Sequence, residues 1–429
     1  MSRIIGIRHR VKELAVDVTI ATEAGDEPVK KLLLHPTMVA ITDGDERRTH
    51  ELATETDELD FLLNRFPTAY RPAAEGEDLS AFLKHQLKER KQGDHKITMV
   101  PIAFEGLRAG DTVGMVLGGS GDRFAYALSR RSEEIGAEVR RIPPFQLKQQ
   151  RPDTDKEQDH VLLATLAAAR PDLFQTVTPR DRLLIFLTEA FRARQEAIKA
   201  RIACQQRLRQ RLIGEIFLSD EGRYPDGNIE DIYDAAKADD VILSNLEKEE
   251  RRRDADLKQA VEALDVWQLF DSVEGVGPTI AAGLITAIRD IRRFDSADKL
   301  KAYLGVHLRS DGKFVRRRSG EVANWNGAGR QALYLVVDQF NRRPKSEWGL
   351  KLRANKAHFR VVHPEAIQID VTDKETKKTR KVWRYNDGHI HKMGLWRTAT
   401  QFVVWLYDAW TALEAENTRR ERESEQKTG

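Results

Sequence analysis

The chain has 429 residues, of which 40% are hydrophobic and 32% are charged, and its formal net charge is +3. This length predicts two or three domains, each with its own core. The one cysteine, Cys204, excludes a disulfide framework or a cysteine-based metal site within the chain, which fits a reducing cytoplasm. No signal-peptide pattern and no apolar run of membrane-spanning length is found, so we expect a cytoplasmic protein without a membrane partner.

Residues 1–175 show strand patterns first and then strands alternating with helices. Strand-like patterns fall at residues 3–8, 14–22, 31–42, Lys96–Ile102, Asp111–Leu117 and Ala137–Ile142. Amphipathic or helical segments fall at Asp57–Phe66, Leu79–Arg90, Asp122–Ile135 and Lys156–Ala169. This order predicts an α/β domain with a mixed sheet of the ribonuclease-H type.

Residues 176–265 consist almost entirely of helix formers with long charged runs. An apolar stripe at helical spacing contains Leu183, Phe186, Leu187, Ala190 and Phe191. The sequence Tyr-Pro-Asp-Gly at 224–227 divides the region into two long arms. We expect an antiparallel coiled coil, through which the chain forms a homo-oligomer.

Residues 266–415 predict an all-α domain that begins with a helix-hairpin-helix at Val273–Asp290. Glycine takes positive φ in the turn 275–277, and Pro278 suits the first position of the next helix. The N–H groups at such a helix start bind phosphate, so Gly275, Gly277 and Thr279 are candidate DNA contacts. The alternative is an αα-hairpin packed for its own sake.

A basic loop follows the next predicted helix, Ala297–Gly305. Residues 301–350 contain ten Lys/Arg against four Asp/Glu, an excess of six, including Lys313, Arg316, Arg317 and Arg318. A basic patch beside a helix-hairpin-helix favours nucleic acid, and a solvated loop is the alternative.

The rest of this domain predicts a helix, a hairpin and a Trp-rich helix. The helix falls at Ala332–Phe340, and strands at Ile367–Asp370 and Val382–Tyr385 form the inserted β-hairpin. In Leu395–Leu413 the stripe Trp396, Phe402, Trp405, Leu406 and Trp410 indicates core rather than a base-stacking surface. We expect the charged tail, residues 416–429, to be disordered.

The order of these parts resembles the insertion-sequence transposases with a RuvC-like DEDD domain, which include Piv-type invertases and bridge-RNA-guided recombinases. The similarity is closest at residues 271–285, 292–305 and 325–334, where Asn326 and Arg330 fit the pattern of the family. Residues 136–148 and 153–167 resemble the last strand and the aspartate-bearing helix of the N-terminal domain. The resemblance implies DNA as partner, with Asn326 and Arg330 among its contacts. It leaves open a structured guide RNA, which the N-terminal domain and the coiled coil would hold.

The resemblance also implies clustered carboxylates that hold two Mg²⁺ ions. Here Arg8 stands where the first Asp is expected and Gly118 where a Glu is expected, whereas Asp155 and Asp159 are retained on one face of a helix. A guanidinium about 4 Å from a divalent ion repels it by several kcal/mol, even at an effective dielectric near 20. Arg8 is instead expected to pair with Asp155 or Asp159.

A nucleophilic serine, in a Ser-Gly pair of the basic loop, is the other centre that the resemblance implies. Asp311 stands in its place before Gly312, and Ser310 lies one residue earlier. Substitution at Arg8, Gly118 and Asp311 together predicts a transposase-family protein that binds DNA with weak or absent strand exchange.

Two alternatives stay open. In the first, the chain is an active transposase in which Asp17, Asp122, Asp155 and Asp159 surround the magnesium pair and Ser310 is the nucleophile. The competing interpretations are a helix N-cap for Asp122, an exposed strand residue for Asp17, and solvated helix charges for Asp155 and Asp159. In the second, the chain is a structural coiled-coil adaptor without affinity for nucleic acid.

Overall fold

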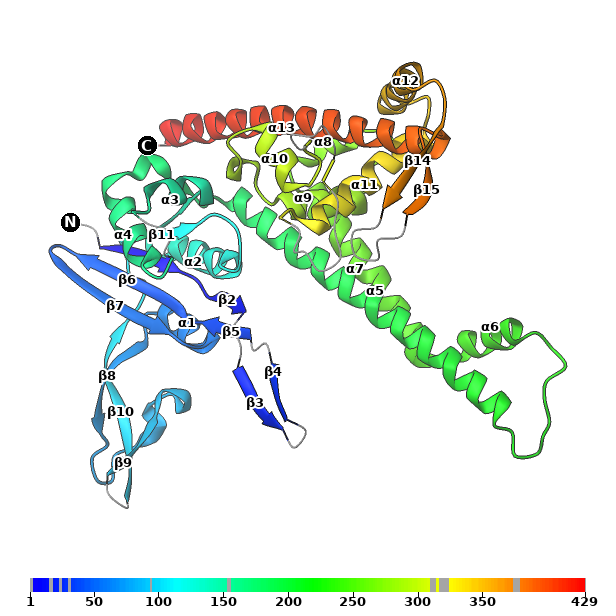
Figure 1. The fold of residues 1–429 in the computed structure, drawn as a ribbon. Helices are drawn as coiled ribbons and strands as arrows, with labels where there is room; N and C mark the ends of the chain where they lie inside the picture. Colours follow the sequence, from blue (N-terminus) through cyan, green and yellow to red (C-terminus); the bar gives the residue numbers. More distant parts are fainter. Residues whose placement is uncertain are drawn as a thin grey trace. The chain divides into compact units, whose positions relative to one another are not determined.

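The computed structural model describes residues 3–14, 18–22, 25–29, 32–92, 95–152, 156–308, 314–315, 324–372 and 379–428. The fold is mixed α/β, as predicted. It divides into two compact units, Met1–Arg182 and Leu183–Gly429 (Figure 1). None of the helices described is both long and apolar enough to cross a membrane.

A mixed sheet organises the first unit, in the order β13-β12-β11-β1-β6-β7 (Figure 1). Its strands are β1 (Ile4–Arg8), β6 (Thr37–Asp43), β7 (Glu46–Leu52), β11 (Thr112–Val116), β12 (Glu138–Ile142) and β13 (Gln175–Thr176). Strands β1, β6 and β7 pair antiparallel, whereas β11 runs parallel to both β1 and β12. The carboxyl ends of β1 and β11 therefore lie at the same edge of the sheet.

Helices cover both faces of this sheet. Ile5 and Ile7 of β1 pack with residues of α1 (Glu55–Leu62) and α2 (Asp122–Ile135). On the other face, α3 (Pro144–Gln150) and α4 (Asp159–Ala169) supply a second cluster. A Cβ on Gly6 would lie 2.0 Å from the carbonyl oxygen of His160, so glycine allows α4 to lie directly against β1.

Smaller sheets complete the first unit. They pair β2 (Val11–Leu14) with β5 (Leu32–His35), β3 (Val18–Thr22) with β4 (Gly25–Val29), and β8 (Phe66–Pro72) and β9 (Lys88–Gln92) with β10 (His95–Glu105). The amphipathic segment Leu79–Arg90 is two short 3-10 turns and the start of β9, not one helix. Gln86 is buried there and donates to Asp60 and to the carbonyl of Arg65, which holds the chain in an irregular path.

The second unit begins with two antiparallel helical arms. They are α5 (Pro179–Phe217), which starts in the first unit, and α7 (Val241–Glu262), with the shorter α6 (Ile229–Asp239) between them in the chain. Ion pairs Arg194–Asp254 and Arg201–Glu250 join α5 to α7 in antiparallel register. The predicted division into two arms is confirmed.

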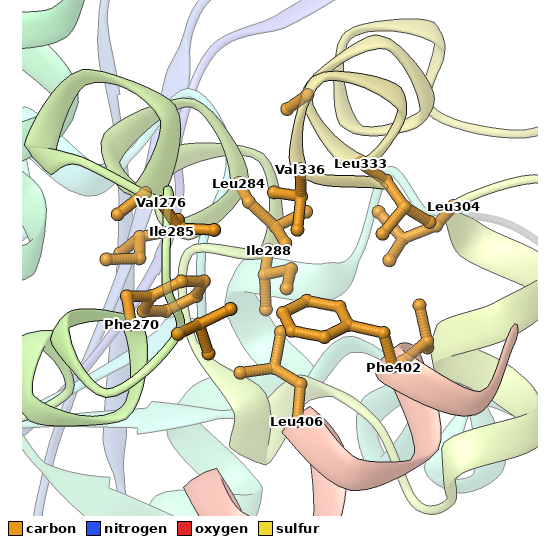
Figure 2. Packing of buried hydrophobic residues seen from close by; sticks show 14 of the residues in the cluster. Phe270, Val276, Leu284, Ile285, Ile288, Leu304, Leu333, Val336, Phe402 and Leu406 are labelled. Carbon is orange, nitrogen blue, oxygen red and sulfur yellow. The ribbon is translucent and has the colours of Figure 1, made fainter. Parts of the chain in front are cut away.

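A helical core occupies the rest of the second unit (Figure 2). It is formed by α8 (Trp267–Asp271), α9 (Pro278–Ile288), α10 (Ala297–Tyr303), α11 (Gly327–Arg342), α12 (Glu347–Val362) and α13 (Asp387–Thr428). Phe402 and Leu406 of α13 face Phe270 and Ile288 in this core (Figure 2). Trp410 is also fully buried, so the interpretation of the Trp-rich stripe as core is confirmed.

Helix α13 is longer than predicted, and the expectation of a disordered tail is wrong. The helix continues to Thr428. Ion pairs one turn apart, Arg420–Glu416 and Arg419–Glu423, offset the charge of this segment within the helix. The predicted β-hairpin is confirmed as β14 (Ile367–Thr372) and β15 (Thr379–Arg384).

Candidate functional site

Glycines follow β11 at the sheet edge where Arg8 ends β1. Gly118 has φ +80° and Gly119 has φ +103°, which L side chains rarely adopt. A Glu at position 118 would therefore be strained in this backbone. Gly121 precedes α2, and a Cβ there would lie 3.0 Å from the Cβ of His9.

Arg8 is the last residue of β1 and lies close enough to His160 of α4 for its charge to act on that imidazole. The Nε of Arg8 is buried and has no hydrogen-bond partner among the residues that the structure describes. Burial lowers the pKa of His160, and the charge of Arg8 lowers this pKa further. A guanidinium and an imidazole with a lowered pKa thus lie at the end of β1, where the resemblance implies a carboxylate.

Asp159 is 6% exposed and is held by an arginine that sequence reasoning did not select. Arg151 donates from Nε to Oδ1 and from Nη2 to Oδ2, both at 2.7 Å. Charge-assisted bidentate pairs of this kind are strong and geometrically specific. The partner of Asp159 is therefore Arg151, in place of the expected Arg8.

One expectation about a neighbouring aspartate is wrong, and another lies outside the described residues. Helix α4 begins at Asp159, with Gln158 as its N-cap, and Asp155, which we expected on the same helix face, is not among the described residues. Gly121 is the N-cap of α2, and Asp122 is the first helical residue. The Asp122 carboxylate lies 3.4 Å from Nη1 of Arg141, and its charge suits the helix N-terminus.

Several predicted residues lie outside the described part of the chain. They are Asp17, Asp155, Ser310, Asp311, Lys313, Arg316, Arg317 and Arg318. Within the described part, no three His, Cys, Asp or Glu side chains are grouped closely enough to hold a metal ion. The described members of the predicted magnesium site do not fit Mg²⁺, because Asp159 and Asp122 face arginines and Arg8 adds a positive charge.

The turn between α8 and α9 forms as the sequence predicts. Gly275 has φ +92°, Gly277 is the N-cap of α9, and Pro278 is the first residue of the helix. The N–H of Val276 donates to the carbonyl of Val273 at 3.0 Å, which closes the turn. Gly277 and Thr279 are exposed at the start of α9, where the first N–H groups have no partner within the helix.

Arg343 is a cation at this turn that sequence reasoning missed. A Cβ on Gly275 would lie 2.6 Å from its Nη1, so the guanidinium lies directly against the glycine. Gln339 accepts a 2.7 Å hydrogen bond from the same Nη1 and orients it. Arg343 follows α11 and is 68 positions from Gly275 (343 − 275), so local patterns give no sign of the contact.

Asn326 and Arg330, both candidate DNA contacts, make internal contacts in the second unit. Asn326 is the N-cap of α11, accepts from the N–H of Gly329 and donates to the hydroxyl of Tyr303 at 2.7 Å. Arg330 lies between two indole rings, 5.3 Å from Trp325 and 4.8 Å from Trp396. Its Nη1 donates to the carbonyl of Val315 at 3.0 Å, and burial lowers its pKa.

Asn326 therefore fixes one end of the basic loop, and Arg330 fixes its middle. Val315 lies within the loop, next to the antiparallel bridge between Leu308 and Phe314. Tyr303, bound by Asn326, in turn donates to the carbonyl of Ala287 at the end of α9. These hydrogen bonds thus join the basic loop and the start of α11 to the C-terminal end of α9.

Residues 267–348 match the model of the transposase IS116/IS110/IS902 family. The matched segment begins at α8 and contains the turn at Gly275, the basic loop, Arg330 and Arg343. No curated protein matches the chain. The match covers residues 267–348 of the 429, so this segment is similar to insertion-sequence transposases.

Proposed function

We propose that this protein binds duplex DNA as a member of the insertion-sequence transposase family, and that its strand exchange is weak or absent. Gly277 carries the DNA-binding part of the proposal. Its φ of −76° is open to any residue, and a Cβ there would meet no atom of the described residues within 4 Å. Glycine at this position is explained if a ligand approaches the backbone closely, because a Cβ would block that approach.

A phosphate is the ligand that this position suits best. The N-terminus of α9 presents N–H groups and the positive end of the helix dipole. Arg343 adds a guanidinium on the other side of the turn, against Gly275. The basic loop, to which Arg330 and Asn326 bind, adds positive charge to the same unit. We therefore interpret α8, the turn and α9 as a helix-hairpin-helix that contacts the DNA backbone.

The proposed loss of strand exchange rests on the sheet edge of the first unit. The bidentate Arg151–Asp159 pair and the positive φ of Gly118 both oppose a carboxylate cluster for Mg²⁺. We propose that this sheet is RuvC-like. Its support is the strand order, in which the antiparallel β7-β6-β1 is followed by the parallel β11 and β12.

We further propose that α5 and α7 form a coiled coil through which two copies associate. Five large hydrophobic residues are exposed at the helix ends and in the connection between these arms: Phe217, Leu218, Tyr224, Val241 and Ile242. An exposed apolar patch of this kind often marks an interaction site. A structured RNA remains a second proposed partner, which nucleic acid recovered with the purified protein would identify.

The test of DNA binding is Gly277→Ala in the full chain, with a random-sequence duplex. Loss of backbone-to-phosphate hydrogen bonds, worth roughly 1.5–3 kcal/mol each, should weaken binding at least tenfold. Gly227→Ala is the matched control, because Gly227 is also exposed and its Cβ would lie more than 4 Å from every atom in the described part of the chain. Equal affinities of the two variants would contradict the proposal.

A further inference from the structure

The β14–β15 hairpin is a two-stranded ribbon of the second unit that pairs with no other strand in the described part of the chain (Figure 1). Such a ribbon is only marginally stable by itself, so its base must be fixed. Arg360 of α12 donates to the carbonyl of Tyr385 at 2.9 Å and pairs with Asp387 at 2.5 Å. The rings of His363, Tyr385 and His389 stack in succession, with centroids 3.7 and 5.3 Å apart.

One face of the ribbon is open to solvent. The strand register pairs Gln368 with Trp383 and Asp370 with Lys381, and side chains alternate along each strand, so these four share a face. All four are exposed, and Trp383 is 57% exposed, whereas Trp348 and Trp410 are buried in the helical core. The opposite face carries Ile369 and Val382, which are half-buried. The same face carries the exposed Thr379, so hydrogen-bonding side chains surround one large aromatic ring there.

We propose that this open face reads base edges in the major groove of duplex DNA. The inference rests on the proposed function and adds sequence preference to it. The major groove admits a two-stranded β-ribbon. Lys381 has the donor for guanine, Gln368 the donor and acceptor for adenine, and Asp370 the acceptor for the amino group of cytosine.

The charge of the ribbon favours DNA over a protein partner. Residues 367–384 contain six Lys/Arg and three Asp/Glu, an excess of three, which suits the phosphates on both walls of a groove. The centres of protein–protein interfaces are depleted of charged residues, whereas Asp370 and Lys381 lie in the middle of the open face. Trp383 then packs against the sugar or the thymine methyl group at the edge of the contact.

The test is a selection from a randomised duplex library with the full chain and with the double variant Gln368→Ala/Lys381→Ala. We expect the wild type to enrich a short motif. The double variant should lose the motif while its affinity for random duplex falls less than about threefold, since phosphate contacts supply nonspecific binding. The matched control is Lys258→Ala/Gln259→Ala, which removes the same two residue types at exposed positions of α7.

A single variant separates loss of base contacts from loss of hairpin structure. Gln368→Glu keeps the size of the side chain and replaces a donor by an acceptor, so it should change the enriched motif rather than abolish it. No motif from the wild type, an unchanged motif in both variants, or an effect on structured RNA alone would overturn the inference while DNA binding stands. Absence of any duplex binding by the wild type would overturn the proposed function as well.

Discussion

At the scale of single residues, the ion-pair partner of each aspartate in the first unit decides whether its carboxylate is available to bind a metal ion. Asp159 meets the guanidinium of Arg151 at two points and is nearly removed from water. Asp172 makes the same bidentate contact with Arg170, at 2.9 and 2.8 Å, but on the surface. The pairs Arg151–Asp159 and Arg170–Asp172 are therefore a buried and an exposed example of the same kind of ion pair.

This pair of contacts makes a prediction about stability. Asp159→Asn removes the carboxylate of a buried bidentate ion pair, so the free energy of unfolding should fall by roughly 3 kcal/mol. Asp172→Asn should change it little, because water screens the exposed pair. Denaturant titration of both variants measures the difference. Equal, small changes would mean that Asp159 is free to act elsewhere, for instance as a metal ligand.

At the scale of elements, two glycines in one turn have different reasons to be glycine. Gly275 needs its positive φ and its missing Cβ, because Arg343 lies against it. Gly277 has a negative φ, and a Cβ there would contact none of the described residues, so the described fold does not require glycine at this position. Glycine at position 275 is thus required by the fold, whereas glycine at position 277 is required by the proposed ligand.

Gly275→Ala should accordingly destabilise the protein. Forcing a side chain into this backbone region costs about 1–3 kcal/mol, and Arg343 must also move. Thermal or denaturant unfolding should show the loss for Gly275→Ala and almost none for Gly277→Ala. If both variants were as stable as the wild type, the turn would not have the described geometry.

Elements with strong local signals were predictable. Helix α2 over Asp122–Ile135 and the start of α9 at Pro278 follow from periodicity, a preceding glycine and a proline at the first position. Strand β7 has the polar sequence Glu46–Leu52 and was missed, because it lies at the sheet edge, where few of its side chains are buried. Contacts between distant segments, such as Arg343 with Gly275 and Arg330 with Val315, have no local pattern.

At the scale of the whole molecule, association is the first question. If the exposed apolar residues between α5 and α7 mediate it, the double variant Leu218→Asp/Ile242→Asp should be monomeric by light scattering. Val361→Asp is the control, since Val361 of α12 is 81% exposed, as is Leu218. A wild-type monomer, or an oligomer unchanged by the double variant, would contradict association through this region.

Strand exchange is the second question. A serine recombination centre joins the protein covalently to DNA, whereas a binding protein leaves the duplex intact. Under the proposed function, this chain binds DNA but does not join it covalently. The arginines at the sheet edge give the physical reason, because they oppose the divalent ions that the phosphodiester reaction needs.

The most direct test is a search for a covalent protein–DNA adduct. The purified chain is incubated with Mg²⁺, DNA carrying the flanking element ends and any RNA recovered with it, and the products are separated under denaturing conditions. We expect bound DNA before denaturation and no adduct after it. An adduct that forms with the wild type and disappears with Ser310→Ala would contradict the account.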